Sequence, residues 1–273
     1  DWFEADHSAL ATGLASMGMY LGMAIGAAVT PIVVTEYGLS DTMAIFACFS
    51  LLSTVLFLFF VQESSEAMGD EAAGFGEYLD ILKNKNMRYL VLFSFMGLGA
   101  FNGLTAWLES ILAQHDISAD DAGLVAGLII IGGIFGALII PAISDYMSRR
   151  KPFMIIGGFI GAVMVYPLCY TLELDSLYIY ALTMGFFFLA ILPVQLSFAE
   201  EEVGKEKAGA AVGLLFLCGN TGGILAIPLM SIVNGDSGTW DNGIYLIMAA
   251  LFLGVMIAFG VKDHTVAKAS SNA

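Results

Sequence analysis

Residues 141–151 read Pro-Ala-Ile-Ser-Asp-Tyr-Met-Ser-Arg-Arg-Lys, and the last three are basic. The stretch lies between two apolar runs, residues 121–143 and 153–171. A helix needs roughly 20 mostly apolar residues to cross the hydrocarbon core of a bilayer. Each run is long enough for one crossing. The stretch therefore predicts a short basic connection between two membrane-spanning helices.

The rest of the chain repeats this arrangement. Hydrophobic residues make up 58% of its 273 residues and charged residues only 13%, which is too little charge to cover a soluble domain of this length. We therefore predict an all-α polytopic membrane protein. Its eight transmembrane helices are expected at residues 10–34, 41–62, 89–112, 121–143, 153–171, 177–198, 208–233 and 243–261.

The connections between these spans alternate in charge. All ten Lys and Arg lie on one set of connections and the tail, within residues 83–88, 149–151, 205–207 and 262–268. The other connections, 35–40, 113–120, 172–176 and 234–242, carry acidic residues and no Lys or Arg. Basic residues are retained on the cytoplasmic side of a membrane. This separation of basic from acidic connections therefore predicts eight spans, with both ends of this sequence in the cytoplasm.

The longest connection, residues 63–88, separates two spans from six. Its first part, 63–74, is small and acidic and predicts a solvated linker. Phe75, Tyr78, Leu79 and Leu82 follow at i, i+3, i+4 and i+7, which indicates a short amphipathic helix on the cytoplasmic membrane surface. The predicted divisions are residues 1–62, the connection 63–88, residues 89–262 and a cytoplasmic tail, 263–273.

Glycines recur at four-residue intervals in two spans, which predicts close approach of helix backbones in lipid. They are Gly18, Gly22 and Gly26, then Gly123 with Gly127 and Gly132 with Gly136. The segment that starts at residue 9 also resembles the one that starts at residue 209, with Tyr20 and Asn220 as counterparts. Parallel repeats of this kind relate the two halves of some transporters.

The basic connection resembles the signature of the major facilitator superfamily, G-x-x-x-D-R/K-x-G-R/K-R/K, which joins the second and third helices of each half. Asp145, Arg149 and Arg150 match it, whereas positions 141, 146 and 148 depart from it. Residues 200–209 resemble the charged loop before helix eleven of that family. Residues 2–3 and 9–13 resemble the start of helix five, although the arginine expected there is absent.

The resemblance covers essentially the whole chain and implies an incomplete fold of that family. Residues 1–62 would be the last two helices of the N-terminal half, and residues 89–262 the six-helix C-terminal half. Helices one to four would be missing. Residues 213–215, Gly-Leu-Leu, with Asn220 beyond them, resemble the haem- and choline-carrier branch, as does the acidic end of span 177–198.

Polar side chains inside the spans are candidates for a substrate cavity, because they are costly to place in lipid. Asn102, Thr105 and Glu109 share one helix face, and the resemblance implies that this helix, the seventh, lines the cavity. The full set of candidates is Tyr20, Phe101, Asn102, Thr105, Trp107, Glu109, Gln195 and Asn220. For Gln195 and Asn220 the alternative is a hydrogen bond between neighbouring helices. Residues 57–60 and 186–188, which are rich in phenylalanine, are assigned to lipid contact and packing.

Glu109 is the one carboxylate that we place well inside a span. A carboxylate there could exchange a proton or bind a cation, and so couple transport to an ion gradient. The alternative is an interfacial carboxylate beside Trp107.

The basic connection itself is interpreted as a conformational latch. The resemblance implies that Asp145 accepts hydrogen bonds at the start of the span beginning near Ala208, where the helix dipole favours an anion. Arg149 and Arg150 would bridge to Glu200 or the acidic residues after it. The alternative is that these basic residues only set the topology.

The predicted function is secondary active transport of a small solute by alternating access, with the site between the two halves. Coupling to a proton or another cation is an open possibility. The alternatives are a multidrug or metabolite proton antiporter of the same superfamily and, in a different class, a self-contained eight-helix channel or scaffold.

We expect a multi-pass protein of the cell membrane. The net charge of −15 argues against nucleic acid as a partner. The pattern of side chains predicts no enzyme site, no metal and no cofactor.

Overall fold

The computed structural model describes residues 8–60, 74–235 and 238–263, and these residues are helical apart from short connections. The helices are α1 (Ser8–Phe60), α2 (Phe75–Ile81), α3 (Lys85–Ala113), α4 (Ala119–Tyr146), α5 (Lys151–Tyr170), α6 (Leu174–Phe188), α7 (Ile191–Val203), α8 (Ala208–Asn234) and α9 (Asp241–Phe259). The predicted all-α fold is confirmed. The linker 63–73 and the tail 264–273 lie outside the described residues.

Seven helical segments of the described chain are long and apolar enough to cross a membrane. Six correspond to the predicted spans from residue 89 onward, and the seventh is Val33–Phe60. The predicted span 10–34 falls in the first part of α1 and is not one of the seven. In that part, the side chains of residues 8–10, 27–28 and 31–32 lie outside the description. The predicted span 177–198 is a longer segment, Leu174–Val203, made of α6 and α7.

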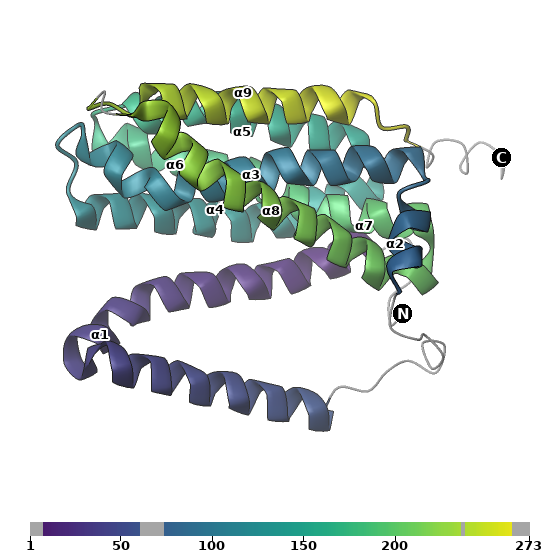
Figure 1. Ribbon diagram of the computed structural model, residues 1–273, viewed down its shortest axis with the longest axis horizontal. Helices are drawn as coiled ribbons and strands as arrows, with labels where there is room; N and C mark the ends of the chain where they lie inside the picture. The colour runs from purple at the N-terminus through teal and green to yellow at the C-terminus, as the bar shows by residue number, and fades with distance from the viewer. Residues whose placement is uncertain (1–7, 61–73, 236–237, 264–273) are drawn as a thin grey trace.

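Helix α1 folds back on itself at Gly38, as Figure 1 shows. Gly38 has φ 79° and ψ 166°, a conformation open to glycine but not to residues with a Cβ. The first arm, residues 8–37, lies near the remaining helices at its start and diverges from them toward the bend. None of the apolar window in the second arm is buried within the structure. The two predicted spans in this region are therefore the two arms of one bent helix.

Helices α3 to α9 form a bundle in which glycines allow close backbone contact. A Cβ on Gly136 of α4 would lie 2.0 Å from the carbonyl oxygen of Phe186 in α6. A Cβ on Gly99 of α3 would lie 2.8 Å from the carbonyl carbon of Gly222 in α8. Close packing is thus confirmed for Gly132 and Gly136. By contrast, no described atom lies within 4 Å of such a Cβ on Gly18, Gly22, Gly26, Gly123 or Gly127.

One end of the bundle, here called the basic end, holds the connections that carry Lys and Arg. Helix α2 lies at this end, and its Asp80 pairs with Lys207 and Lys83. Pairing with Lys207, and then with Lys83, lowers the pKa of Asp80. Asn84 and Asn86 donate hydrogen bonds of 3.0 and 2.7 Å to the carboxylate of Glu202. These contacts attach α2 to the residue that precedes α8, and the start of α3 to the end of α7.

The opposite end, here called the acidic end, is joined by aromatic and polar contacts. The rings of Trp107 and Trp240 lie with their centroids 4.6 Å apart. The hydroxyl of Tyr170 donates to Asp241, and the backbone N–H of Trp240 donates to Gln114. The C-terminal parts of α3 and α5 and the start of α9 are thereby held together.

Candidate solute pocket and the ion pairs at the basic end

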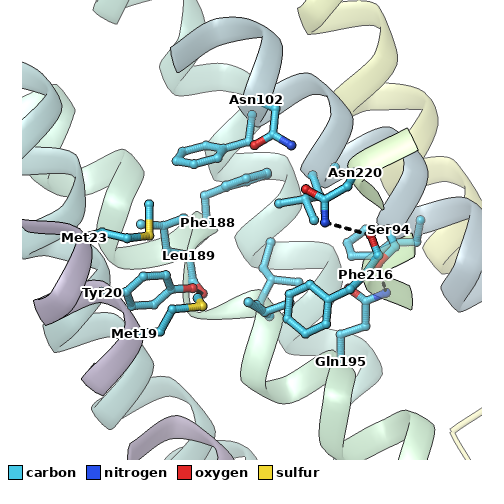
Figure 2. Close-up of a pocket in the computed structure, with 16 residues that line it drawn as sticks. Met19, Tyr20, Met23, Ser94, Asn102, Phe188, Leu189, Gln195, Phe216 and Asn220 are labelled. Carbon is cyan, nitrogen blue, oxygen red and sulfur yellow. Dashed lines mark hydrogen bonds between the residues drawn. The ribbon is translucent and has the colours of Figure 1, made fainter. Parts of the chain in front are cut away.

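A pocket lies between the first arm of α1 and the bundle (Figure 2). Met19, Tyr20 and Met23 of α1 form one wall. Helices α3, α6, α7 and α8 supply the rest of the lining. The cavity volume of about 240 Å³ is below the roughly 300–1,000 Å³ of pockets for drug-sized ligands. Its size suits a small solute.

Five of the eight candidate cavity residues line this pocket: Tyr20, Phe101, Asn102, Gln195 and Asn220. They come from α1, α3, α7 and α8, so these segments meet at one site. The residues that line the pocket, all within the described ranges, include no charged side chain. Recognition at these residues would rest on aromatic rings and amide groups.

The amide N–H groups of two lining residues are used within the protein. Gln195 donates from Nε2 to the carbonyl of Leu90, at 2.8 Å, and to Ser94, at 3.0 Å. Asn220 donates from Nδ2 to the carbonyl of Phe216, at 2.9 Å. Gln195 thus links α7 to α3, as the alternative for it supposed, and it also lines the pocket. Asn220 bonds within its own helix and not to a neighbour.

Tyr20 is the one candidate from α1, and its side chain is buried. Its hydroxyl donates a 2.9 Å hydrogen bond to the carbonyl oxygen of Leu189. Leu189 lies between α6 and α7, where the helix is interrupted. The bond joins the first arm of α1 directly to the six-helix bundle.

The other three candidates do not line this pocket. Thr105 donates its hydroxyl back to the carbonyl of Phe101, at 2.9 Å. Trp107 donates from Nε1 to the carbonyl of Ile227, at 2.9 Å, and so links α3 to α8. Glu109 is exposed and lies further along α3 toward the acidic end. The helix face that Asn102, Thr105 and Glu109 share extends beyond the pocket, so the residues nearer the acidic end do not reach the pocket.

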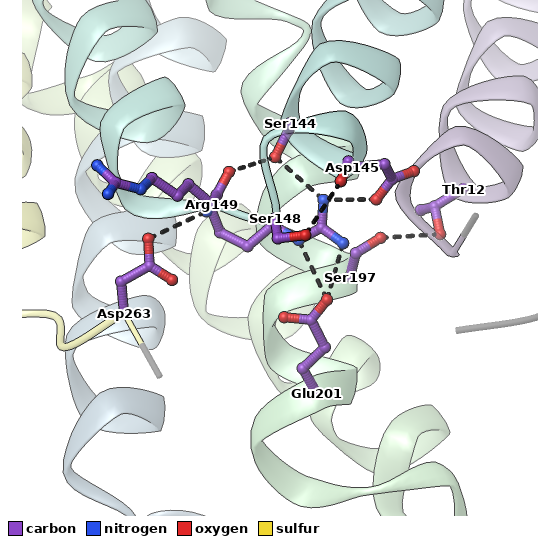
Figure 3. Close-up of polar contacts among 9 residues, drawn as sticks. Thr12, Ser144, Asp145, Ser148, Arg149, Ser197, Glu201 and Asp263 are labelled. Carbon is purple, nitrogen blue, oxygen red and sulfur yellow. Dashed lines mark hydrogen bonds and ion pairs between the residues drawn. The ribbon is translucent and has the colours of Figure 1, made fainter. Parts of the chain in front are cut away.

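The basic connection forms a buried ion-pair cluster (Figure 3). The guanidinium of Arg150, only 3% exposed, lies 2.6 Å from Oδ1 of Asp145 and 2.8 Å from Oε1 of Glu201. Burial opposes the charge of Arg150, but Glu201 and Asp145 outweigh it, and the net effect is to raise the pKa of Arg150. Ser144 accepts from Arg150 and donates to the carbonyl of Arg149. The connection is thereby fixed to the end of α7.

Only part of the predicted latch is brought together. Arg150 pairs with Asp145 and with Glu201, which is one of the acidic residues expected there, whereas Glu200 is not a partner. Arg149 is exposed, and neither its side chain nor Glu200 forms an ion pair within the described residues. Residues 200–203 belong to α7 and not to a loop. Adjacent residues of a helix point about 100° apart, so only one of two neighbouring glutamates can face the arginine.

The helix start beside Asp145 is that of α1, whereas the resemblance implied the one near Ala208. Figure 3 shows Thr12 of α1 next to Asp145, and Thr12 accepts a 3.3 Å hydrogen bond from Ser197. Gly13 packs against Ala137 and Pro141 of α4. The segments that start at residues 9 and 209 resemble each other in sequence, and the sequence alone did not distinguish the two helix starts.

Sequence reasoning missed some pocket residues. Phe188 was assigned to lipid and packing, but it lines the pocket, and its ring stacks on Phe101 with centroids 5.7 Å apart. Phe216 and Leu189 also contribute to the lining. Pro193 was one signal, because a proline removes a backbone hydrogen bond from a helix, but Pro141, Pro167 and Pro228 lie inside helices that are not interrupted.

The sequence profile of the Major Facilitator Superfamily matches residues 1–227 and, in a second match, residues 108–273. The chain therefore belongs to this superfamily of membrane transporters. An uncharacterised protein of Archaeoglobus fulgidus is 31% identical over 221 residues, which is 81% of this chain and 100% of that protein.

Two further relatives are choline/ethanolamine transporters called FLVCR2. The rat protein is 25% identical over 296 residues, and the human protein 27% over 286. The matches cover 100% and 96% of this chain, but 54% of each relative. The chain thus spans about half the length of these relatives, and the resemblance to the haem- and choline-carrier branch is confirmed.

Proposed function

We propose that this chain forms part of a secondary transporter that moves a small solute by alternating access. The observation that carries the proposal is the pocket itself, which is lined by the first arm of α1 on one side and by the six-helix bundle on the other. A site between two units that rock against each other can face either side of the membrane in turn.

The basic end would face the cytoplasm of the cell membrane. At that end α1 is held against α4 and α7 through Thr12 and Gly13, whereas toward Gly38 it diverges from the bundle. The pocket would then be closed toward the cytoplasm in this conformation. We further propose that four more helices pack against the second arm of α1. This proposal is supported by the exposure of that arm and by the greater length of the relatives.

Choline and ethanolamine are the first solutes to test, because the relatives are choline/ethanolamine transporters. The pocket suits an ammonium group without a carboxylate, since aromatic rings attract cations and Tyr20, Phe101, Phe188 and Phe216 contribute rings to the lining. A proton-coupled drug antiporter is the alternative within the family. Glu109 would be its coupling residue on this chain, although it lies outside the pocket.

The test is uptake of radiolabelled choline by the full-length protein in proteoliposomes. We expect saturable uptake, competition by ethanolamine and exchange of internal unlabelled choline for external label. A channel would give no such exchange stimulation, and a scaffold no uptake. Absence of uptake and exchange with choline and ethanolamine would contradict the proposed solute. Uptake that never saturates would contradict the carrier mechanism.

Asn220 and Thr221 provide a matched pair of variants. Both are exposed on α8, and both donate a side-chain hydrogen bond to the carbonyl four residues earlier, but only Asn220 lines the pocket. Asn220→Ala should raise the KM for choline by about threefold to tenfold, the effect of one lost hydrogen bond. Thr221→Ala should leave the KM unchanged. Equal effects of the two substitutions would argue against this pocket as the solute site.

A further inference from the structure

The hydrogen bond between Tyr20 and Leu189 depends on a proline one turn further along the chain. In an α-helix the N–H of residue i donates to the carbonyl of residue i−4. Pro193 stands four residues after Leu189 and has no N–H. The carbonyl of Leu189 therefore lacks its usual donor within α7. In a membrane such a carbonyl must be satisfied from elsewhere.

The hydroxyl of Tyr20 supplies that donor from a different part of the fold. Tyr20 belongs to the first arm of α1, 169 residues away in the chain, and the O···O distance is 2.9 Å. Both residues are buried, at 3% and 7% exposure, and both line the pocket. The bond lies on the inter-helix boundary across which the proposed rocking takes place.

We infer that Tyr20, Leu189 and Pro193 form a conformation-dependent contact, beside the pocket, that stabilises the packing of α1 against the bundle. Pro193 creates a carbonyl acceptor, and the Tyr20 hydroxyl occupies it while Thr12 and Ser197 are together. Separation of α1 from the bundle would remove the hydroxyl of Tyr20 from that acceptor, and no other tyrosine of the described residues lines this pocket. The inference rests on the proposed alternating access and adds a residue-level determinant of its equilibrium.

Thr12 and Ser197 provide a direct readout of this conformation. Their hydroxyl oxygens are 3.3 Å apart, so cysteines at both positions should form a disulfide when α1 lies against α7. The experiment uses the full-length protein with Cys48, Cys169 and Cys218 replaced, and with Thr12→Cys and Ser197→Cys added. The rate of copper-phenanthroline cross-linking is then measured in membranes, without solute.

Tyr20→Phe should slow cross-linking about threefold to tenfold, the effect of one net hydrogen bond. Pro193→Ala restores an N–H that can satisfy Leu189 within the helix. In the Pro193→Ala background, Tyr20→Phe should therefore change the rate less than twofold, a loss of coupling that a double-mutant cycle measures. Tyr166→Phe, which alters an exposed tyrosine on α5, is the matched control and should have no effect.

Several results would overturn the inference. One is an unchanged rate in Tyr20→Phe together with a slow rate in Tyr20→Leu, since this would assign the effect to ring packing. Another is an equal effect of Tyr20→Phe on the cross-linking rate in the Pro193 and the Pro193→Ala backgrounds. This comparison remains valid even if Pro193→Ala alone lowers expression. The readout needs no transported solute. A failure to transport choline would therefore contradict the proposed solute without altering this result.

Discussion

The side chain of Arg150 donates two hydrogen bonds to one carboxylate oxygen of Glu201, from Nη2 at 2.8 Å and from Nε at 3.1 Å. Its remaining nitrogen, Nη1, lies 2.6 Å from Asp145. A single guanidinium thus satisfies one carboxylate of α4 and one of α7. Removing that guanidinium would leave the buried carboxylate of Asp145 without this partner and close to the carboxylate of Glu201, which is partly exposed.

Arg150→Ala is therefore expected to destabilise the protein strongly. Breaking a buried ion pair by removing one partner costs about 3–5 kcal/mol. The neighbouring Arg149 is exposed, so Arg149→Ala should change stability by less than about 0.5 kcal/mol. Thermal unfolding of the full-length protein in detergent compares the two variants. Similar melting temperatures for both would show that the ion-pair cluster does not stabilise this conformation.

Glycine substitutions on α4 should differ sharply in effect. A Cβ at Gly136 would lie 2.0 Å from a backbone oxygen of α6, whereas a Cβ at Gly127 has no described atom within 4 Å. Gly136→Ala should destabilise the protein by about 1–3 kcal/mol, the usual cost of overpacking. Gly127→Ala should be neutral or slightly stabilising, because alanine favours helix formation. Melting temperatures that fall equally in both variants would contradict the α4–α6 contact.

Membrane orientation can be measured with single cysteines at Ser148 and Ser176. Ser148 lies in the basic connection and Ser176 at the start of α6, near the acidic end. If the basic end is cytoplasmic, an impermeant thiol reagent should label position 176 in intact cells and leave position 148 unlabelled. After permeabilisation, both should react. Labelling of position 148 in intact cells would reverse the proposed orientation.

Glu109→Gln tests ion coupling. The substitution keeps the shape of the side chain and removes its charge. If Glu109 carries a proton or cation, the variant should lose gradient-driven accumulation of solute but retain exchange across the membrane. Asp120→Asn, at another exposed acid near the same end, is the control and should behave as wild type. Normal accumulation by Glu109→Gln, with an unchanged pH profile, would identify Glu109 as an interfacial residue.

The sequence predicted the helical segments well because their signals are local. A run of apolar residues and a sign change between connections each report on one span at a time, and together they located the segments α3 to α9. The pocket was only partly predicted. Asn102 and Asn220 are polar residues inside spans and drew attention for that reason. Phe188 did not, because an aromatic side chain that lines a pocket has the same sequence signature as one that faces lipid.

The least predictable feature of the site was which of two neighbouring acidic residues contacts the arginine. Glu200 and Glu201 are identical in chemistry, and which of them meets Arg150 depends on the rotation of α7 about its axis. That rotation is set by tertiary contacts of the whole helix, such as the bond from Gln195 to Leu90. In the same way, the start of α1 near Asp145 reflects the packing of α1 on α4, which no local pattern reports.

The glycine contact between α3 and α8 has a consequence for inhibitor design. Because Gly99 and Gly222 bring these two backbones together, we expect Asn102 and Asn220 to move as one body in the proposed alternating access. A compound that touches only this pair would bind both conformations with similar affinity, and equal affinity shifts no population. A compound that also reaches Met19 or Met23 on α1 would distinguish the conformations. Such a compound could arrest the cycle instead of merely competing for the pocket.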